Sequence, residues 1–115
     1  YHGMAPLVSH LKELGLIDAR AVHQTACFEA GVKFARAEGI VPAPESTHAV
    51  RVAVDEALKC KEEGVSRTIL FNLSGHGHFD MAAYDDYFAG KLEDRDYDEA
   101  ALKASLAELP QIAAE

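Results

Sequence analysis

An apolar run from Thr68 to Leu73 leads directly into the polar, glycine-rich sequence Ser-Gly-His-Gly-His at 74–78. A run of this length and character is typical of a strand that is covered on both faces, as in a parallel sheet. Ligands of open α/β sheets bind beyond the carboxyl ends of the strands, which is where Ser74 would lie. Glycines at 75 and 77 would let the backbone adopt a positive φ or approach a ligand closely. The run therefore predicts a binding site at the end of a parallel strand.

A parallel strand needs neighbouring strands, and the sequence offers few of them. The other candidate is a weak segment from Ala19 to His23. Most of the remaining chain has the apolar spacing that is typical of helices. We therefore expect an α/β protein, mostly helical with one or two strands, that forms part of a larger parallel sheet flanked by helices.

Prolines and glycines delimit the expected helices. Two prolines favour an extended link at 40–44, because each one disfavours helical geometry in the residue before it. Gly39 and Gly64 are suited to end helices, and Ser46 or Thr47 can cap the helix that follows the link. These signals predict helices at about 7–14, 25–38, 47–63, 81–92 and 98–109.

The charge balance and the cysteines restrict the partners and the compartment. The 115 residues carry 11 basic and 19 acidic side chains, a net charge of −8, which argues against nucleic acid and anionic membranes as partners. No apolar run approaches the ~20 residues of a membrane-spanning helix, and the first residues lack the pattern of a signal peptide. We interpret Cys27 and Cys60 as buried hydrophobes in a reducing compartment, and we expect a cytoplasmic location.

Two side chains are candidates for chemistry, and each has a plainer alternative. Ser74 lacks the glycines two residues away on both sides that mark a nucleophilic serine elbow, so a hydrogen-bonding role is favoured. The plainer role for Ser74 is to cap a turn. Glu45 precedes a helix, where the macrodipole stabilises a carboxylate whether or not it is catalytic.

The alternating residues His76, His78 and Asp80 form a third candidate. In an extended segment they would share one face and could bind a metal ion. A zinc site needs three or four ligands, and no spacing places the other histidines near this loop. We therefore predict no metal site.

Two longer motifs give a more specific indication. Residues 37–49 read AEGIVPAPESTHA, and residues 71–77 read FNLSGHG. In this order, with a helix between them, they resemble the C-terminal part of the tryptophan synthase β subunit family. The opening YHGMAP and the acidic C-terminal extension resemble the divergent second branch of that family. The resemblance covers nearly the whole chain and is firmest up to about Leu92.

The resemblance implies a lyase of fold type II that uses pyridoxal 5′-phosphate and replaces the hydroxyl of L-serine with indole in tryptophan biosynthesis. Ser74 matches the serine whose hydroxyl bonds the pyridine nitrogen of the cofactor. Unlike a carboxylate, a hydroxyl does not hold that nitrogen protonated, which favours β-elimination and replacement. Glu45 matches a catalytic glutamate beside the cofactor ring, and Gly39 and Gly75 match glycines that shape the cofactor pocket.

Departures from the family pattern suggest both a different assembly and an incomplete site. The main branch has Arg, Asp and Lys after the serine-glycine pair, whereas this chain has His76, His78 and Phe79, which argues against coupling to an α subunit. No segment matches the family's Schiff-base lysine, glycine-rich phosphate loop or indole-activating glutamate. We therefore expect a C-terminal portion, with a partial cofactor domain at 1–92 and an acidic link and helix at 93–115. It would be inactive without the N-terminal part, with which it would form a homodimeric enzyme.

Two alternatives stay open at this point. The chain could be a small acidic interaction domain that binds a metal ion or a protein through the GHGH sequence at 75–78. It could also belong to another fold type II enzyme, such as a relative of the serine or threonine dehydratases, although the paired motifs favour the first family.

Overall fold

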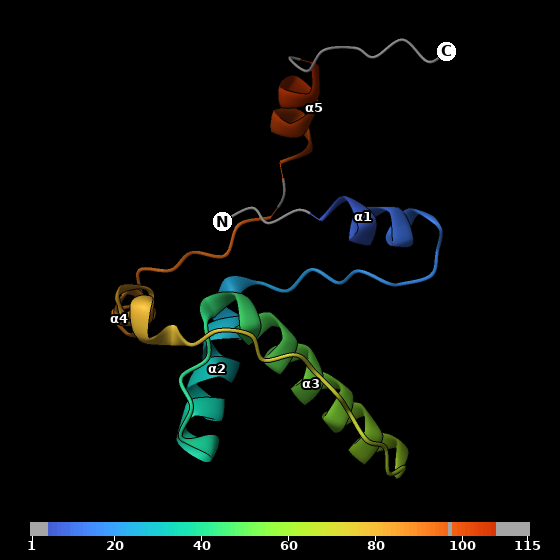
Figure 1. Cartoon of the computed structure of the whole chain (residues 1–115). Coiled ribbons are helices and arrows are strands. Elements are labelled where there is room, and N and C mark those ends of the chain that lie inside the picture. The colour runs from blue at the N-terminus through green and yellow to red at the C-terminus, as the bar shows by residue number, and fades with distance from the viewer. Residues whose placement is uncertain (1–4, 97, 108–115) are drawn as a thin grey trace.

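The computed structural model describes residues 5–96 and 98–107 and builds them from helices and irregular segments. The helices are α1 (Pro6–Glu13), α2 (Gln24–Glu38), α3 (Pro44–Glu63), α4 (Met81–Phe88) and α5 (Glu99–Ala107), and a 3₁₀ turn spans Gly77–Phe79 (Figure 1). The mostly helical character predicted from the sequence is confirmed. The predicted end of the last helix, at about 109, lies outside the described residues.

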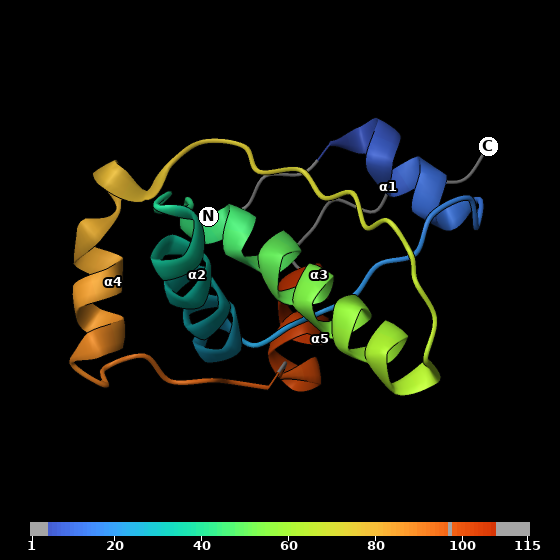
Figure 2. The same cartoon turned by 90° about the horizontal axis from the view of Figure 1, so that it is seen from below.

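The described residues contain no strand, so neither the strand predicted at 68–73 nor the weak candidate at 19–23 is observed. The segment 65–73 instead runs back along α3 as an irregular chain (Figures 1 and 2). The expectation of one or two strands is therefore wrong for the described residues. The physical reason is that a strand becomes regular only when the backbone of a neighbouring strand accepts and donates its hydrogen bonds.

Glycines end the two long helices as predicted, whereas the start of α3 and the end of α4 differ from prediction. Gly39 has φ 71° after α2, and Gly64 has φ 67° after α3. Helix α3 begins at Pro44, before the predicted caps, because proline is pre-organised for the first helical position. The hydroxyl of Thr47 donates to the Pro44 carbonyl inside the first turn. Helix α4 ends at Phe88, earlier than the predicted 92.

The core lies where α2 packs against α3 and α4. The ring of Phe28 on α2 contacts Tyr84 of α4 edge to face, with 5.0 Å between ring centroids. Cys27 and Cys60 are both buried and free, as predicted, and burial raises the pKa of the Cys27 thiol.

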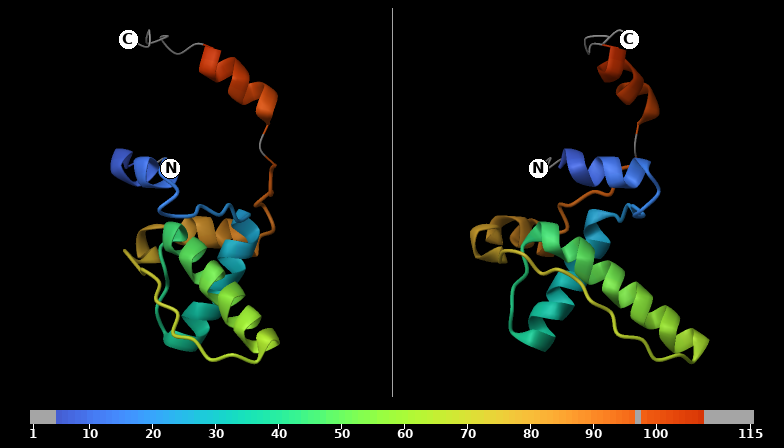
Figure 3. Two further views of the ribbon diagram at one scale, coloured as in Figure 1. Left: turned by 90° about the vertical axis from the view of Figure 1, so that its right-hand side faces the viewer. Right: turned by 45° about the vertical axis from the view of Figure 1, so that its right-hand side comes forward.

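Helices α1 and α5 stand apart from this core (Figures 1 and 3). The radius of gyration is 17.4 Å, whereas a compact domain of this length has about 13 Å. Large apolar side chains of α1 stay exposed, among them Leu7 at 70%. Among the described residues, no helix is long and apolar enough to cross a membrane.

Candidate functional site

The proline-containing link between α2 and α3 is the fixed centre of the site. Pro42 and Ala43 are buried, and the link is extended as predicted up to Ala43. The carbonyl of Val41 accepts a hydrogen bond from the Gly77 amide at 2.8 Å. The carbonyl of Pro42 accepts one from the Tyr84 hydroxyl at 2.6 Å. The loop before α4 and α4 itself therefore hold this link by its backbone.

Two glycines make the close packing around the link possible. A Cβ at Gly77 would lie 2.6 Å from the Pro42 carbonyl oxygen, and a Cβ at Gly31 would lie 2.6 Å from Thr47. Gly75 has φ 72°, with Ala43 as its nearest packing neighbour. The positive φ predicted for this pair of glycines is confirmed at Gly75. At Gly77 the close approach is to the Pro42 carbonyl, so the predicted approach to a ligand stays a prediction.

Ser74 is connected to the first turn of α3. The hydroxyl of Ser46, which is buried, donates to the Ser74 carbonyl oxygen, and the two side-chain oxygens are 3.5 Å apart. The Ser74 side chain itself is exposed. The two sequence motifs, 28 residues apart at these serines, therefore meet in space, and Ser74 is exposed where they meet.

Glu45 lies on the first turn of α3, next to Ser46, and its side chain is exposed. It lines a cavity of 330 Å³ at the N-terminal ends of α2 and α3. The other lining residues are Gln24, Cys27, Phe28, Pro44, Thr47 and His48.

Gly39, the fourth predicted site residue, lies at the opposite end of the link from Glu45. It ends α2, and a Cβ there would meet nothing within 4 Å. The structure therefore joins Ser74, Gly75 and the Glu45 turn, but it does not bring Gly39 to them.

The histidine loop does not have the extended geometry on which the metal alternative rests. A 3₁₀ turn at Gly77–Phe79 interrupts the alternation, and the His76 Nδ1 accepts a hydrogen bond from the His78 amide at 3.3 Å. Across the described residues, no group of three possible ligand side chains comes together. The alternative of a metal-binding domain therefore gains no support from the arrangement of these side chains.

Three residues that contribute to this region were not recognised as functional candidates. The sequence predicts Ser46 only as a helix cap, although it lies in the same motif as Glu45. Tyr84 gives no sequence signal, because its carbonyl partner lies 42 residues earlier. Asp94 lies in the predicted acidic link, where no sequence pattern indicates that it accepts hydrogen bonds from the amide and hydroxyl of Thr25, 69 residues away.

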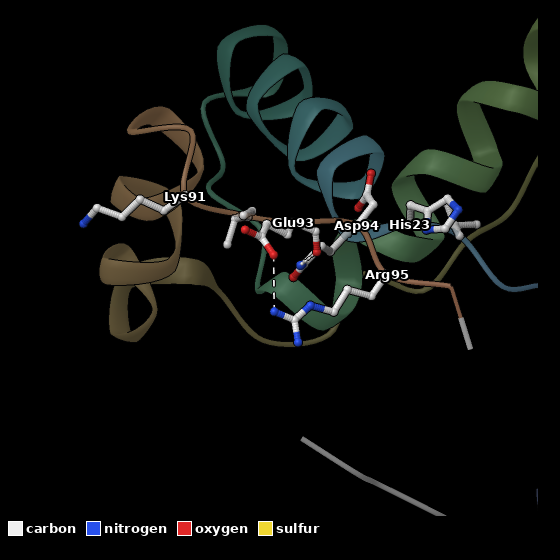
Figure 4. Close-up of a pocket in the computed structure, with 8 residues that line it drawn as sticks. His23, Lys91, Glu93, Asp94 and Arg95 are labelled. Atoms are coloured by element: carbon white, nitrogen blue, oxygen red, sulfur yellow. Dashed lines mark hydrogen bonds and ion pairs between the residues drawn. The ribbon is translucent and has the colours of Figure 1, made fainter. Parts of the chain in front are cut away.

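A second and larger cavity lies beside Asp94 (Figure 4). It measures 590 Å³, and none of the predicted site residues lines it. Its lining residues come from the start of α2 and from the acidic link: Val22, His23, Gln24, Lys91, Leu92, Glu93, Asp94 and Arg95.

Comparison with known proteins agrees with the resemblance of the motifs. No protein-family model matches the sequence. The chain is 66% identical over 94 residues to tryptophan synthase beta chain 2 of Aquifex aeolicus, covering 82% of this chain and 22% of that protein. Beta chain 2 of Methanosarcina mazei is 60% identical over 93 residues, covering 81% and 21%. Tryptophan synthase beta chain of Pyrococcus horikoshii is 54% identical over 110 residues, covering 96% and 24%.

The chain thus spans about a fifth of the length of the curated relatives it matches, which agrees with the prediction of a portion of such a protein. Relatives named beta chain 2 agree with the predicted second branch. With 54–66% identity over four fifths or more of its length, the chain belongs to the tryptophan synthase beta chain family.

Proposed function

We propose that this chain is the C-terminal portion of a fold type II, pyridoxal 5′-phosphate-dependent enzyme that joins L-serine and indole to give L-tryptophan. The observation that carries the proposal is the high identity to several chains named tryptophan synthase beta. The meeting of the two family motifs at Ser46 and Ser74 supports it, because it brings Glu45, Ser74 and Gly75, three of the four residues that the resemblance assigns to the site, into one region.

Ser74 is the residue we assign to the pyridine nitrogen of the cofactor. Its carbonyl is held by Ser46, while its exposed hydroxyl has only a 3.5 Å contact with the Ser46 oxygen. Because the Ser46 proton is donated to the Ser74 carbonyl, the Ser74 hydroxyl is the donor in that long contact and can exchange it for an external acceptor. The backbone of Ser74 is thus held in place while its side chain stays accessible, which suits a hydroxyl that bonds the pyridine nitrogen without protonating it. When bound, the cofactor supplies the electron sink for elimination and replacement at the serine side chain.

Glu45 is the residue we assign to proton transfer beside the ring. It lies on the turn that binds Ser74 through Ser46, and it faces a cavity. A carboxylate there can accept a proton from a reacting group and return it. The roles of Gly75 and Gly39 in shaping the cofactor pocket stay predictions, with Gly75 supported by its place beside Ser74.

We also propose that the rest of the enzyme covers the segment 65–73. Leu70 is 95% exposed and Val65 is 42% exposed, although the run is strongly apolar. Burial of such side chains is favourable, so a sheet contributed by the remaining enzyme would be a suitable partner. A homodimer, independence from an α subunit and a cytoplasmic location stay predictions.

The test is a grafted enzyme, in which this chain replaces the corresponding segment of the Aquifex aeolicus beta chain 2. We expect it to form tryptophan from serine and indole. Ser74→Ala removes one hydrogen bond to the cofactor and should lower kcat/KM about tenfold. The 115-residue chain alone should form no tryptophan.

Ser9→Ala is the matched control, because Ser9 is exposed and lies outside both motifs and outside the segment 65–73. It should leave kcat/KM unchanged. A grafted enzyme that folds and binds pyridoxal phosphate but makes no tryptophan would contradict the proposal, as would a Ser74→Ala variant that behaves like Ser9→Ala.

A further inference from the structure

The N-terminal end of α2 lacks a cap from its own segment. His23 occupies the cap position without a side-chain hydrogen bond, and the first turn contains no acidic residue. The first amide groups of a helix have no partner within the helix and carry a partial positive charge. This helix end therefore needs an acceptor from elsewhere in the chain.

The acidic link supplies that acceptor. The Asp94 carboxylate accepts a hydrogen bond from the Thr25 amide at 3.1 Å and another from the Thr25 hydroxyl. The Gln24 side chain donates to the Glu93 carbonyl at 2.7 Å. Figure 4 shows Asp94 and His23 at this end of α2. The bonds from Thr25 lower the pKa of the Asp94 carboxyl, as expected for a carboxylate that is bound in its charged form.

The same turn of α2 forms one wall of the cavity beside Glu45. Gln24, Cys27 and Phe28 line that cavity together with Glu45. A residue that fixes the start of α2 therefore also fixes the shape of the space that Glu45 faces. The acidic link binds the same turn of α2 through Gln24 and Thr25.

We infer that Asp94 is a positioning residue, a cap supplied from 69 residues away that holds the first turn of α2 against the cavity of Glu45. The consequence for turnover rests on the proposed function, whereas the capping itself does not. The C-terminal acidic link is thereby a part of the site's framework.

The test compares variants of the grafted enzyme by hydrogen exchange at residues 24–28 and by steady-state kinetics. Asp94→Ala removes the cap, and we expect exchange about fivefold faster, the usual consequence of losing one helix cap. Asp94→Asn should restore near-parental exchange, because asparagine caps helices as well as aspartate. Since the cavity wall acts on the chemical step, kcat should fall with Asp94→Ala while KM for serine stays the same, and Asp94→Asn should restore kcat.

Glu93→Gln is the matched control, because only the backbone of Glu93 contacts α2, while its side chain pairs with Arg95 at 3.2 Å. It removes the same charge and should change neither measurement. If Asp94→Ala fails to accumulate, Thr25→Ala removes one of the two bonds and should give an intermediate increase in exchange.

If hydrogen exchange at residues 24–28 is unchanged in Asp94→Ala, or is equally faster in Glu93→Gln, Asp94 does not cap α2. Faster exchange with unchanged kcat would overturn the positioning role. If the parental graft folds but makes no tryptophan, the proposed function fails and the positioning role fails with it, while the exchange comparison still decides the cap.

Discussion

The two segments that flank α3 both lack regular secondary structure, but they are held in opposite ways. The link at 40–43 enters the helix, and both of its middle carbonyls, at Val41 and Pro42, accept hydrogen bonds from distant residues. The segment 65–73 leaves the helix, and within the described residues none of the backbone groups at 66–73 forms a backbone hydrogen bond. Phe71 contacts Phe34 of α2, whereas Leu70 is 95% exposed.

The difference separates two kinds of sequence information. The proline link specifies its own backbone geometry, because proline fixes φ and has no backbone N–H that needs an acceptor. The apolar run specifies only that it should be covered, and its regular structure depends on strands that the described residues do not provide. A family motif can therefore be well packed at one end of a helix and unpartnered at the other.

Gly77→Ala is the substitution for which this contrast predicts the largest loss of stability. The new methyl group would lie 2.6 Å from the Pro42 carbonyl oxygen and 2.7 Å from Val41, so the backbone of the link has to move. Overpacking of this kind costs about 3 kcal/mol. We expect a decrease of that size in the free energy of unfolding, measured with urea.

Gly64→Ala is the control at the other end of α3, where φ is 67° and a Cβ would meet nothing within 4 Å. The left-handed conformation alone costs about 1 kcal/mol for alanine. Equal losses in the two variants would mean that the link is no better fixed than the segment that leaves the helix.

Tyr84→Phe gives a smaller effect on the same region. It removes the hydroxyl that donates to the buried Pro42 carbonyl at 2.6 Å, and an acceptor left without a partner costs about 2 kcal/mol. We expect this loss in urea unfolding at neutral pH, with little change in helix content by circular dichroism.

Alkaline titration provides the control for Tyr84. Burial, with a smaller contribution from the Asp80 carboxylate, raises the pKa of Tyr84 to about 12 from 10.0. The folded state thus favours the neutral phenol, so this contribution is fully present below pH 10.0 and is lost as the pH rises through about 12. Tyr84→Phe should remove this part of the alkaline dependence. If the stability of Tyr84→Phe falls between pH 10 and 12 as steeply as that of the parent, the alkaline dependence does not come from Tyr84.

The same contrast explains which features could be predicted from the sequence. The glycine ends of α2 and α3 and the extended link follow from local backbone preferences, and they were predicted correctly. The strand at 68–73 was not, because its regularity depends on a neighbouring backbone. The cap at Asp94 and the bond from Tyr84 join residues 69 and 42 positions apart, and no local pattern marks such pairs.

The candidate site divides along the same line. Ser74, Gly75 and Glu45 were found through motif resemblance, and the structure places them around the start of α3. Ser46, which connects them, lies within one of those motifs, but as a buried donor it could be recognised only from its contact with the Ser74 carbonyl. Resemblance therefore identified the residues with proposed chemical roles, whereas the packing identified the residue that holds them together.

The smallest expected effect is that of Leu70→Asn. Because this side chain is 95% exposed, the substitution should change the free energy of unfolding of the 115-residue chain by less than about 0.5 kcal/mol. Val50→Ala, in a core position that is 2% exposed, is the contrasting control and should cost about 2 kcal/mol. A large loss from Leu70→Asn in the chain alone would mean that the segment is already packed there. No loss in the chain together with a large loss in the grafted enzyme is the outcome that the proposed enzyme requires, because only there would the apolar run be covered.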